Sequence, residues 1–181
     1  MQVEVGRGAI ELVADDITGL RVHAVVNAAN RTLTGGGGVD GAIHRAAGPD
    51  LLAACLELPQ LAPGVRCPTG DVRVTAGGDL AARYVIHGVG PIHSQYEPAE
   101  AARLLRGVHV RALEEAESRG CASVAFPAIS CGVYGFPVDE AAPVAVAAAR
   151  EALERDGSVT KIVFALVDAR AMHAWRRALG A

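Results

Sequence analysis

Short apolar runs and longer amphipathic stretches alternate along this chain. The apolar runs, such as AIELVA (9–14) and HAVVNAA (23–29), have the length and composition of buried strands. Ala-rich stretches with apolar residues at helical spacing lie between later runs, and some start near a proline or end at a glycine. The pattern predicts strands at 9–14, 23–29, 71–76, 84–90, 123–128 and 159–167, and helices at 39–48, 49–58, 97–120, 139–157 and 169–179.

Strands separated by helices are typical of an α/β layered fold with a largely parallel sheet. Ligands bind such folds at the carboxyl ends of the strands. Three loops follow predicted strands at that end: ADDIT (14–18), NAANRTLTGGGGVD (27–40) and PAISCGVYGFP (127–137). We therefore expect these loops to meet at one edge of the sheet.

Length and composition indicate one domain that covers residues 1–181, since the chain has 181 residues and a hydrophobic fraction of 51%. No apolar stretch approaches the length that spans a bilayer. The N-terminal segment MQVEVGRGAIELVADD carries acidic residues where a signal peptide has a basic start and an apolar middle. These features predict a cytoplasmic protein with no membrane partner.

The net charge of −3 and the absence of a Lys/Arg cluster argue against binding to duplex DNA, which requires many cationic contacts with phosphates. The four cysteines are far apart and the histidines show no ligand spacing, so neither a disulfide framework nor a metal site is expected. Cys131 could be a nucleophile beside a histidine, but a packed thiol is the favoured interpretation. Binding of a small anionic ligand is still compatible with this composition.

The four glycines at 35–38 form the most unusual segment of the chain. Gly36, Gly38 and Gly41 satisfy GxGxxG, but they lie beyond the end of the preceding strand, and no acidic residue ends a second strand where a dinucleotide site requires one. No Lys-Ser or Lys-Thr follows, so a P-loop is excluded. A cradle of backbone N–H groups at a helix N-terminus remains, with a plain flexible loop as the alternative.

Three polar residues flank these glycines, and each allows two interpretations. Asp40 can simply complement the macrodipole of its helix, or it can act on water or a hydroxyl group beside a bound phosphate. Asn27 and Asn30 can be turn residues, or their amides can bind the hydroxyl groups of a sugar.

A serine esterase is a competing hypothesis. AISCG (128–132) differs by one residue from GxSxG, and Asp168 and His173 follow Ser130 in the order of an α/β-hydrolase triad. However, the segment GVYGFP after Cys131 cannot open directly into the helix that a nucleophile elbow needs, and His173 falls within a helical pattern.

Taken together, the motifs resemble those of macrodomains, the ADP-ribose-binding fold, and specifically the MacroD-type hydrolase branch. The resemblance runs along nearly the whole chain. It is carried by DIT (16–18), VVNAAN (25–30), LTGGGGVDGAIHRAAG (33–48), CPTGDVRVTAGGDL (67–80), YVIHGVGP (84–91) and PAISCGVYGFP (127–137). It implies a three-layer α/β/α sandwich with a central mixed, largely parallel sheet and an ADP-ribose cleft along one edge.

The resemblance also implies roles for individual residues. Asp16 would accept a hydrogen bond from the adenine amino group, with Ile17 beside it, and Asn30 would hold the distal ribose. Asp40 would position or activate a water molecule, with Asn27 supporting that pocket. The diphosphate would lie between two sets of residues: Gly37, Gly38 and Val39 on one side, and Ser130, Gly132, Val133 and Tyr134 on the other.

The implied reaction is hydrolysis of the ester between ADP-ribose and an Asp or Glu side chain of a modified protein, together with deacetylation of O-acetyl-ADP-ribose. No metal or organic cofactor is implied, and a monomer is expected. Many macrodomains only bind ADP-ribose, so a non-catalytic reader module is the alternative. The family often has an aromatic residue before the aspartate that follows the last strand, where Val167 stands here; we expect Val167 to line the adenine end of the cleft.

Overall fold

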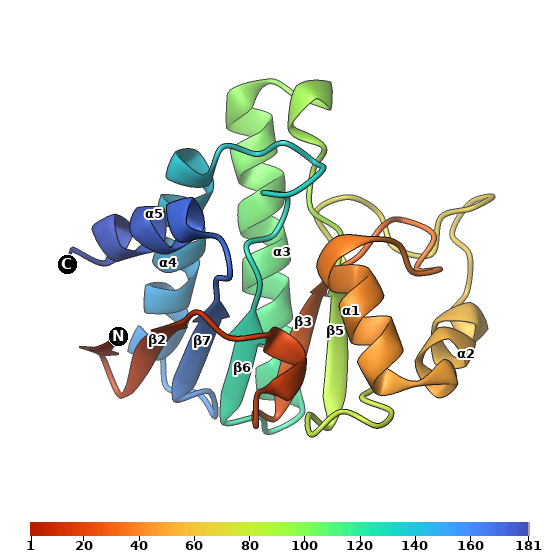
Figure 1. The fold of residues 1–181 in the computed structure, drawn as a ribbon, viewed down its shortest axis with the longest axis horizontal. Coiled ribbons are helices and arrows are strands. Elements are labelled where there is room, and N and C mark those ends of the chain that lie inside the picture. Colours follow the sequence, from red (N-terminus) through yellow and green to blue (C-terminus); the bar gives the residue numbers. More distant parts are fainter. Residues whose placement is uncertain (181) are drawn as a thin grey trace.

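A seven-stranded sheet lies at the centre of the computed structural model, which describes residues 1–180 (Figure 1). The strands are β1 (Gln2–Val5), β2 (Gly8–Val13), β3 (Ala24–Ala28), β4 (Val72–Ala76), β5 (Tyr84–Gly88), β6 (Ser123–Phe126) and β7 (Lys161–Ala165). The helices are α1 (Gly38–Ala47), α2 (Pro49–Glu57), α3 (Pro98–Ser118), α4 (Val138–Glu154) and α5 (Ala169–Leu179), with 3-10 turns at Ile17–Gly19 and His93–Gln95. Each strand and helix predicted from the sequence is present, with its ends shifted by a few residues.

The sheet has the strand order β1-β2-β7-β6-β3-β5-β4. The inner pairs from β2 to β5 are parallel, whereas β1 and β4 pair antiparallel with their neighbours at the two edges. The predicted mixed, largely parallel sheet is therefore confirmed. Strand β1 was not predicted, because its four residues carry too short a pattern; it forms by pairing with β2 through a turn at Gly6, where φ is +55°.

Helices cover both faces of the sheet and make three layers. Successive residues of β3 face opposite layers: Val26 belongs to the core that includes residues of α3, α4 and α5, while the preceding Val25 belongs to the core that includes residues of α1 and α2. This arrangement confirms the predicted α/β/α sandwich. None of the helices within residues 1–180 combines the length and the apolar character needed to cross a membrane.

Parallel pairing brings the loops that follow β2, β3, β6 and β7 to the same edge of the sheet. Helix α1 starts at this edge directly after the glycine-rich loop, and α5 starts there after β7 (Figure 1). The predicted meeting of the three loops is confirmed, since all of them line the adjoining cavities described below.

Candidate functional site

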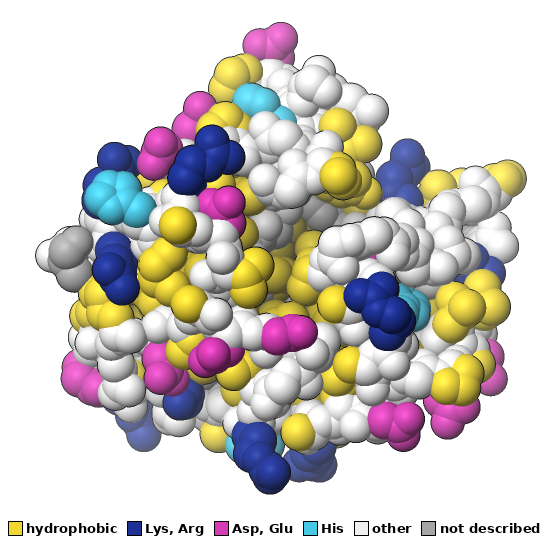
Figure 2. Space-filling model, in the orientation of Figure 1, with side chains coloured by type: hydrophobic (Ala, Val, Ile, Leu, Met, Phe, Trp, Pro, Cys, Tyr) yellow, Lys and Arg dark blue, Asp and Glu magenta, His cyan; other side chains and the backbone are white. Residues whose placement is uncertain are grey.

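A cleft runs along the edge of the sheet where these loops meet. It consists of two adjoining cavities of about 530 Å³ and about 340 Å³, which share Gly38, Val39, Ala128 and Gly132 as walls. Figure 2 shows this face of the molecule hollowed, with hydrophobic side chains in the depression. Because they share these walls, the two cavities form one elongated site, which suits an elongated ligand with one part in each cavity.

Unpaired backbone N–H groups line the smaller cavity from two sides. On one side is the start of α1, where Gly37 provides no side-chain cap. On the other side is the loop after β6, which is held in place by the hydrogen bond from Phe136 N–H to the Ser130 carbonyl (2.9 Å). Within residues 1–180, no acceptor faces the N–H groups of Gly38, Val39 and Asp40 on the first side or those of Ser130, Gly132, Val133 and Tyr134 on the second. Such paired sets of N–H groups, one at a helix N-terminus, suit a phosphate or diphosphate.

Two of the glycines are needed for the shape of this wall. Gly38 has a φ of +58°, in the left-handed region that favours glycine. At Gly41, a Cβ atom would lie 2.5 Å from the carbonyl oxygen of Gly36, closer than packed atoms approach. The glycine-rich loop can therefore lie directly against the first turn of α1 only because these positions lack side chains.

The carboxylate of Asp40 lies in the first turn of α1, and the residue is only 5% exposed. Its Oδ1 accepts a hydrogen bond from Asn27 Nδ2 (2.7 Å) and lies 3.4 Å from His44 Nε2 on the next turn. Burial raises the pKa of Asp40, while the Asn27 hydrogen bond and the charge of His44 act in the opposite direction. A carboxyl group whose pKa is shifted towards neutrality is suited to accept a proton from water.

Asn30 lines the smaller cavity beside Asp40 and shapes the glycine-rich loop. Its Nδ2 donates to the Gly35 carbonyl (3.0 Å), and its Oδ1 accepts from Thr32 Oγ1 (2.8 Å). The amide thus has a fixed orientation at the cleft, where it can meet a hydroxyl group of a ligand.

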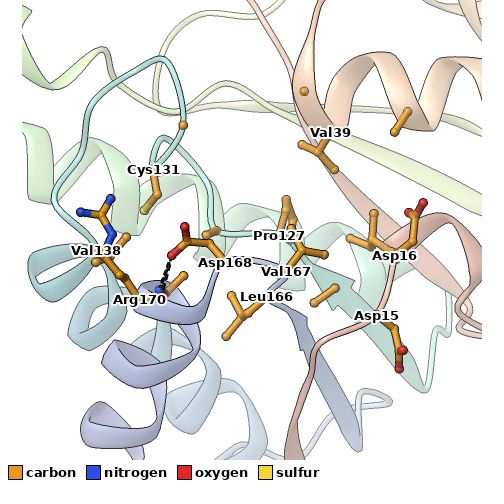
Figure 3. Close-up of a pocket in the computed structure, with 17 residues that line it drawn as sticks. Asp15, Asp16, Val39, Pro127, Cys131, Val138, Leu166, Val167, Asp168 and Arg170 are labelled. Carbon is orange, nitrogen blue, oxygen red and sulfur yellow. Dashed lines mark hydrogen bonds between the residues drawn. The ribbon is translucent and has the colours of Figure 1, made fainter.

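The larger cavity has an acidic and apolar rim (Figure 3). Asp16 Oδ1 accepts from the backbone N–H (2.9 Å) and the hydroxyl group (2.8 Å) of Thr18. The backbone hydrogen bond is the main reason that the pKa of Asp16 is lowered, so this carboxylate is an ionised acceptor. Ile17 supplies a buried apolar surface beside it, and Val167, 78% exposed, projects at the mouth of the cavity.

A family profile described as "Macro domain" matches residues 26–145 of this chain, the span that contains the glycine-rich loop and both N–H walls. The chain belongs to the macro domain family. This match confirms the family resemblance inferred from the motifs.

Relatives and solved structures agree with this assignment. A macro domain-containing protein of Xanthomonas axonopodis pv. citri is 49% identical over 171 residues, 94% of each chain. A protein of Escherichia coli K12 named O-acetyl-ADP-ribose deacetylase is 45% identical and covers 94% of each chain. The Oceanobacillus iheyensis macrodomain with ADP superposes with a TM-score of 0.93 at 39% identity, covering 99% of this chain and 94% of that one.

Nearly every site residue inferred from the sequence of this macro domain lines the cleft. The exception is Asn27, which is fully buried and lies behind Asp40. Arg170 was not predicted from the sequence, although it lines the larger cavity and is the only Lys or Arg among the described residues of either cavity wall. Arg170 lies two residues after Asp168, which directly follows the last predicted strand, and this position at the ligand-binding edge of the sheet could have indicated it.

The structure does not assemble the serine-esterase triad. Among the described residues Ser130 Oγ has no hydrogen-bond partner. Asp168 Oδ1 instead accepts from the backbone N–H groups of Arg170 (2.8 Å) and Ala171 (3.0 Å), which caps α5, and His173 is exposed on that helix. Ser130 does have a φ of +64°, an uncommon value for a residue with a side chain, but no base within residues 1–180 is hydrogen-bonded to its hydroxyl group.

The four cysteines are free thiols. Cys131 reaches the cleft wall, where burial raises its pKa to about 12 and its Sγ donates to the Ile129 carbonyl. At neutral pH this group is a thiol rather than a thiolate, so its structure agrees with the interpretation of a packed cysteine.

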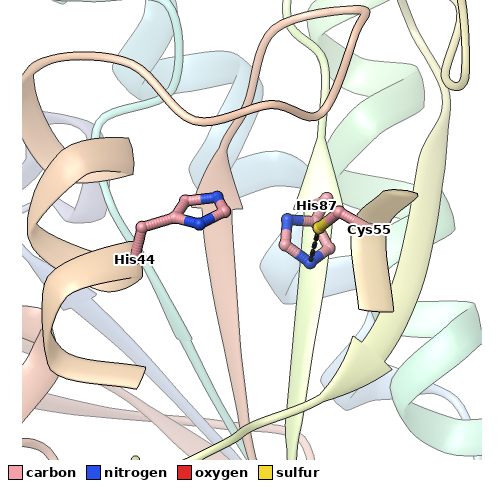
Figure 4. A group of neighbouring side chains, drawn as sticks. All are labelled: His44, Cys55 and His87. Carbon is pink, nitrogen blue, oxygen red and sulfur yellow. Dashed lines mark hydrogen bonds between the residues drawn. The ribbon is translucent and has the colours of Figure 1, made fainter. Parts of the chain in front are cut away.

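Three potential metal ligands meet in a way that their sequence spacing did not indicate. Atoms of His44, Cys55 and His87 that could bind an ion lie within 4.8 Å of one another (Figure 4). However, both ring nitrogens of His87 already have partners: Nδ1 lies 3.2 Å from Asn27 Nδ2, and Nε2 lies 2.9 Å from Thr75 Oγ1. A neutral imidazole engaged in this way has no free lone pair for a metal, so the contacts favour a hydrogen-bonded cluster.

Proposed function

We propose that this macro domain hydrolyses esters of ADP-ribose, releasing mono-ADP-ribose from Asp and Glu side chains of modified proteins and deacetylating O-acetyl-ADP-ribose. The deacetylase name of the E. coli relative and the Trypanosoma brucei macrodomain solved in complex with ADP-ribose support this ligand class. The observation that carries the proposal is the buried Asp40 carboxylate, which the Asn27 amide orients beside the open N–H groups of α1. A module that only bound a diphosphate would gain nothing from a second anion there, because the two would repel.

The elongated cleft fits ADP-ribose from end to end. The adenine lies in the larger cavity, where Asp16 accepts from its amino group and Ile17 packs beside it. The diphosphate lies in the smaller cavity between the N-terminus of α1 and the Ser130–Tyr134 loop. The distal ribose then reaches Asn30, next to Asp40.

The reaction follows from this placement. A water molecule held between Asp40 and the ligand's own phosphate attacks the carbonyl carbon of the ester. The hydroxyl group of the water goes to the acyl carbon, and the proton reaches the ribose oxygen as the ester bond breaks, which leaves a carboxylic acid and free ADP-ribose. Asp40 in its ionised form orients the water and takes its proton, so positioning supplies much of the rate enhancement.

The decisive experiment follows release of ADP-ribose from a protein mono-ADP-ribosylated on glutamate, and release of acetate from O-acetyl-ADP-ribose. Wild-type protein should release both products. Asp40→Ala should abolish turnover while ADP-ribose binding, measured by calorimetry, stays within about tenfold, because a group that acts on the transition state affects rate more than ground-state affinity. Asp50→Ala is the matched control, since Asp50 lies in the first turn of α2 and is exposed.

Each outcome has a distinct meaning. ADP-ribose binding by the wild type without release of either product would identify a reader module and overturn the proposal. Equal loss of binding and turnover in Asp40→Ala would show that this carboxylate is structural. Failure of the wild type to bind ADP-ribose would exclude both functions.

A further inference from the structure

A chain of buried hydrogen bonds leads from Asp40 into the centre of the sheet. Asn27 Nδ2 contacts both Asp40 Oδ1 (2.7 Å) and His87 Nδ1 (3.2 Å). His87 Nε2 contacts Thr75 Oγ1 (2.9 Å), and this hydroxyl group donates to the Ala76 carbonyl (3.1 Å). Asn27 and His87 are register partners on the parallel strands β3 and β5, and both are 0% exposed.

The chemistry of these groups determines which atom donates and which accepts in each of these hydrogen bonds. An ionised carboxylate only accepts, so the amide nitrogen of Asn27 must face Asp40. The same nitrogen reaches His87 Nδ1, which therefore carries the lone pair. Burial lowers the pKa of His87 to about 3, so the ring is neutral and its one proton is on Nε2, where it is donated to Thr75.

The orientation of the Asn27 amide depends on these contacts. Its Oδ1 is buried and has no hydrogen-bond partner within residues 1–180, so no contact of this oxygen prevents the amide from rotating. In the rotated amide, the oxygen would face the Asp40 carboxylate and repel it. Two contacts of Asn27 Nδ2 thus favour the observed orientation of the amide: one with Asp40 Oδ1 and one with His87 Nδ1.

We propose that His87 is a positioning residue for the hydrolytic reaction: its Nδ1 holds the Asn27 amide in the orientation that donates to Asp40, and Thr75 holds His87 in the required tautomer. This inference rests on the proposed function and adds to it two residues that do not line the cleft. It also explains why a histidine occupies a fully buried position of β5, where an aliphatic side chain would otherwise be expected.

Two amide substitutions of His87 test the role of each ring nitrogen. The amide of Asn lies where Nδ1 lies and can accept from Asn27, whereas the amide of Gln lies where Nε2 lies and cannot. We expect His87→Asn to keep kcat within about threefold of wild type and His87→Gln to lower kcat by about tenfold or more, with KM and the ADP-ribose Kd nearly unchanged in both. Packing alone predicts the reverse order of the kcat values, because the smaller Asn side chain would leave a bigger void in the core than Gln.

A second pair of variants tests the tautomer. Thr75→Ser keeps the hydroxyl group that accepts from His87 Nε2, while Thr75→Val replaces it with a methyl group of similar shape. We expect kcat to stay within about threefold for Thr75→Ser and to fall further, by about three- to tenfold, for Thr75→Val. Equal values for the two variants would contradict the role of Thr75.

A readout that needs no turnover separates this inference from the proposed function. Titration of the Asp40 carboxyl group by carbon NMR should show a higher pKa in His87→Gln than in wild type or His87→Asn, because the Asn27 hydrogen bond that lowers this pKa is lost. His44, whose charge lowers the pKa of Asp40, is the same in all three proteins, as are Cys55 and Tyr134, whose pKa values the Asp40 charge raises. If wild type lacks turnover, the function fails while the titration still decides the inference.

Two results would overturn the inference. One is the same kcat and the same Asp40 titration in His87→Asn and His87→Gln. The other is stoichiometric binding of Zn²⁺ by wild type that disappears in Cys55→Ser. Cys55 Sγ lies 3.5 Å from His87 Nε2, and an ion bound there would require the lone pair on Nε2 and the proton on Nδ1, the tautomer opposite to the one proposed (Figure 4). Cys121→Ser is the matched control, because Cys121 is also a buried thiol but lies outside the cluster.

Discussion

Asn27 donates a hydrogen bond of 2.7 Å to Asp40, which lies 13 residues further along the chain on a different element. The donor is at the end of β3, and the acceptor is in the first turn of α1. The glycine-rich loop lies between them in the sequence and brings the two side chains together. The Asn27 amide, which does not line the cleft, therefore acts on the Asp40 carboxylate, which does line it.

Removal of the Asn27 amide should change the pH dependence of the reaction. In Asn27→Ala, Asp40 keeps the burial that raises its pKa and loses the hydrogen bond that lowers it, so its pKa rises. Since the ionised form is active, the acidic limb of the profile of kcat against pH should move to higher pH. His44, whose charge acts on Asp40, is unchanged, as are Cys55 and Tyr134, whose pKa values the Asp40 charge raises.

The matched control is Asn30→Ala, which removes an amide that donates to the Gly35 carbonyl and, within residues 1–180, makes no hydrogen bond to Asp40. This variant should lose rate without a shift of the acidic limb. An unshifted limb in Asn27→Ala, with turnover still measurable, would show that the Asn27 hydrogen bond does not control the protonation of Asp40.

Ser130 should prove dispensable as a nucleophile. Loss of the nucleophile of a serine hydrolase triad costs on the order of 10⁶ in kcat. We expect Ser130→Gly, which tolerates the φ of +64°, to lose less than about tenfold in kcat, and Ser130→Ala to lose somewhat more because alanine strains this backbone conformation. A fluorophosphonate probe provides a direct measurement: stoichiometric labelling of Ser130 would reinstate the esterase hypothesis.

Val167 offers a place to strengthen binding. It is 78% exposed at the mouth of the larger cavity, so an aromatic ring there can lie over the adenine. Stacking on an aromatic side chain contributes about 1–3 kcal/mol, and valine already provides some apolar contact, so we expect Val167→Tyr or Val167→Phe to tighten ADP-ribose binding by roughly three- to tenfold. Because the adenine is far from the scissile bond, kcat at saturation should hardly change.

Calorimetry on wild type and the two Val167 variants measures this effect. Val133→Tyr is a useful comparison, because Val133 is exposed as well but lies at the smaller cavity, away from the adenine. Unchanged affinity in folded Val167→Tyr would mean that another group already covers the adenine.

Asp168 should stabilise the fold in a pH-dependent manner. Hydrogen bonds from the backbone N–H groups of Ala171 and Arg170 lower its pKa in the folded state. A carboxyl group whose folded-state pKa is lowered contributes stability above its unfolded-state pKa, and this contribution is lost as the pH falls through the folded-state value. Asp168→Ala should therefore lower Tm by about 2–4 °C at neutral pH and by less in acid.

The control for this cap is Asp168→Asn, whose amide oxygen can accept the same backbone hydrogen bonds without a titrating charge. It should have a Tm between those of wild type and Asp168→Ala at neutral pH. A Tm difference between wild type and Asp168→Ala that stays constant down to acidic pH would contradict the role of the ionised carboxylate.

The sequence by itself determined the order of most elements and the edge at which the ligand site lies. Apolar runs and helical spacing are local signals, and parallel strands have one ligand-binding edge, so the loops at 14–18, 27–40 and 127–137 could be placed together in advance. The motifs within them also determined the family. Edge strand β1 escaped prediction because its four residues form a strand only when β2 lies alongside.

Only the tertiary structure decided the environment of Asp40. The burial that raises its pKa comes from the loops and helices packed around it, and the amide that orients it is held by a histidine 60 residues away from that amide in the chain. The spacing of His44, Cys55 and His87 carries no ligand pattern, yet the packing of α1 and α2 against the sheet brings them together. Hydrogen bonds between distant residues depend on strand register and layer packing, and neither is encoded in a local sequence period.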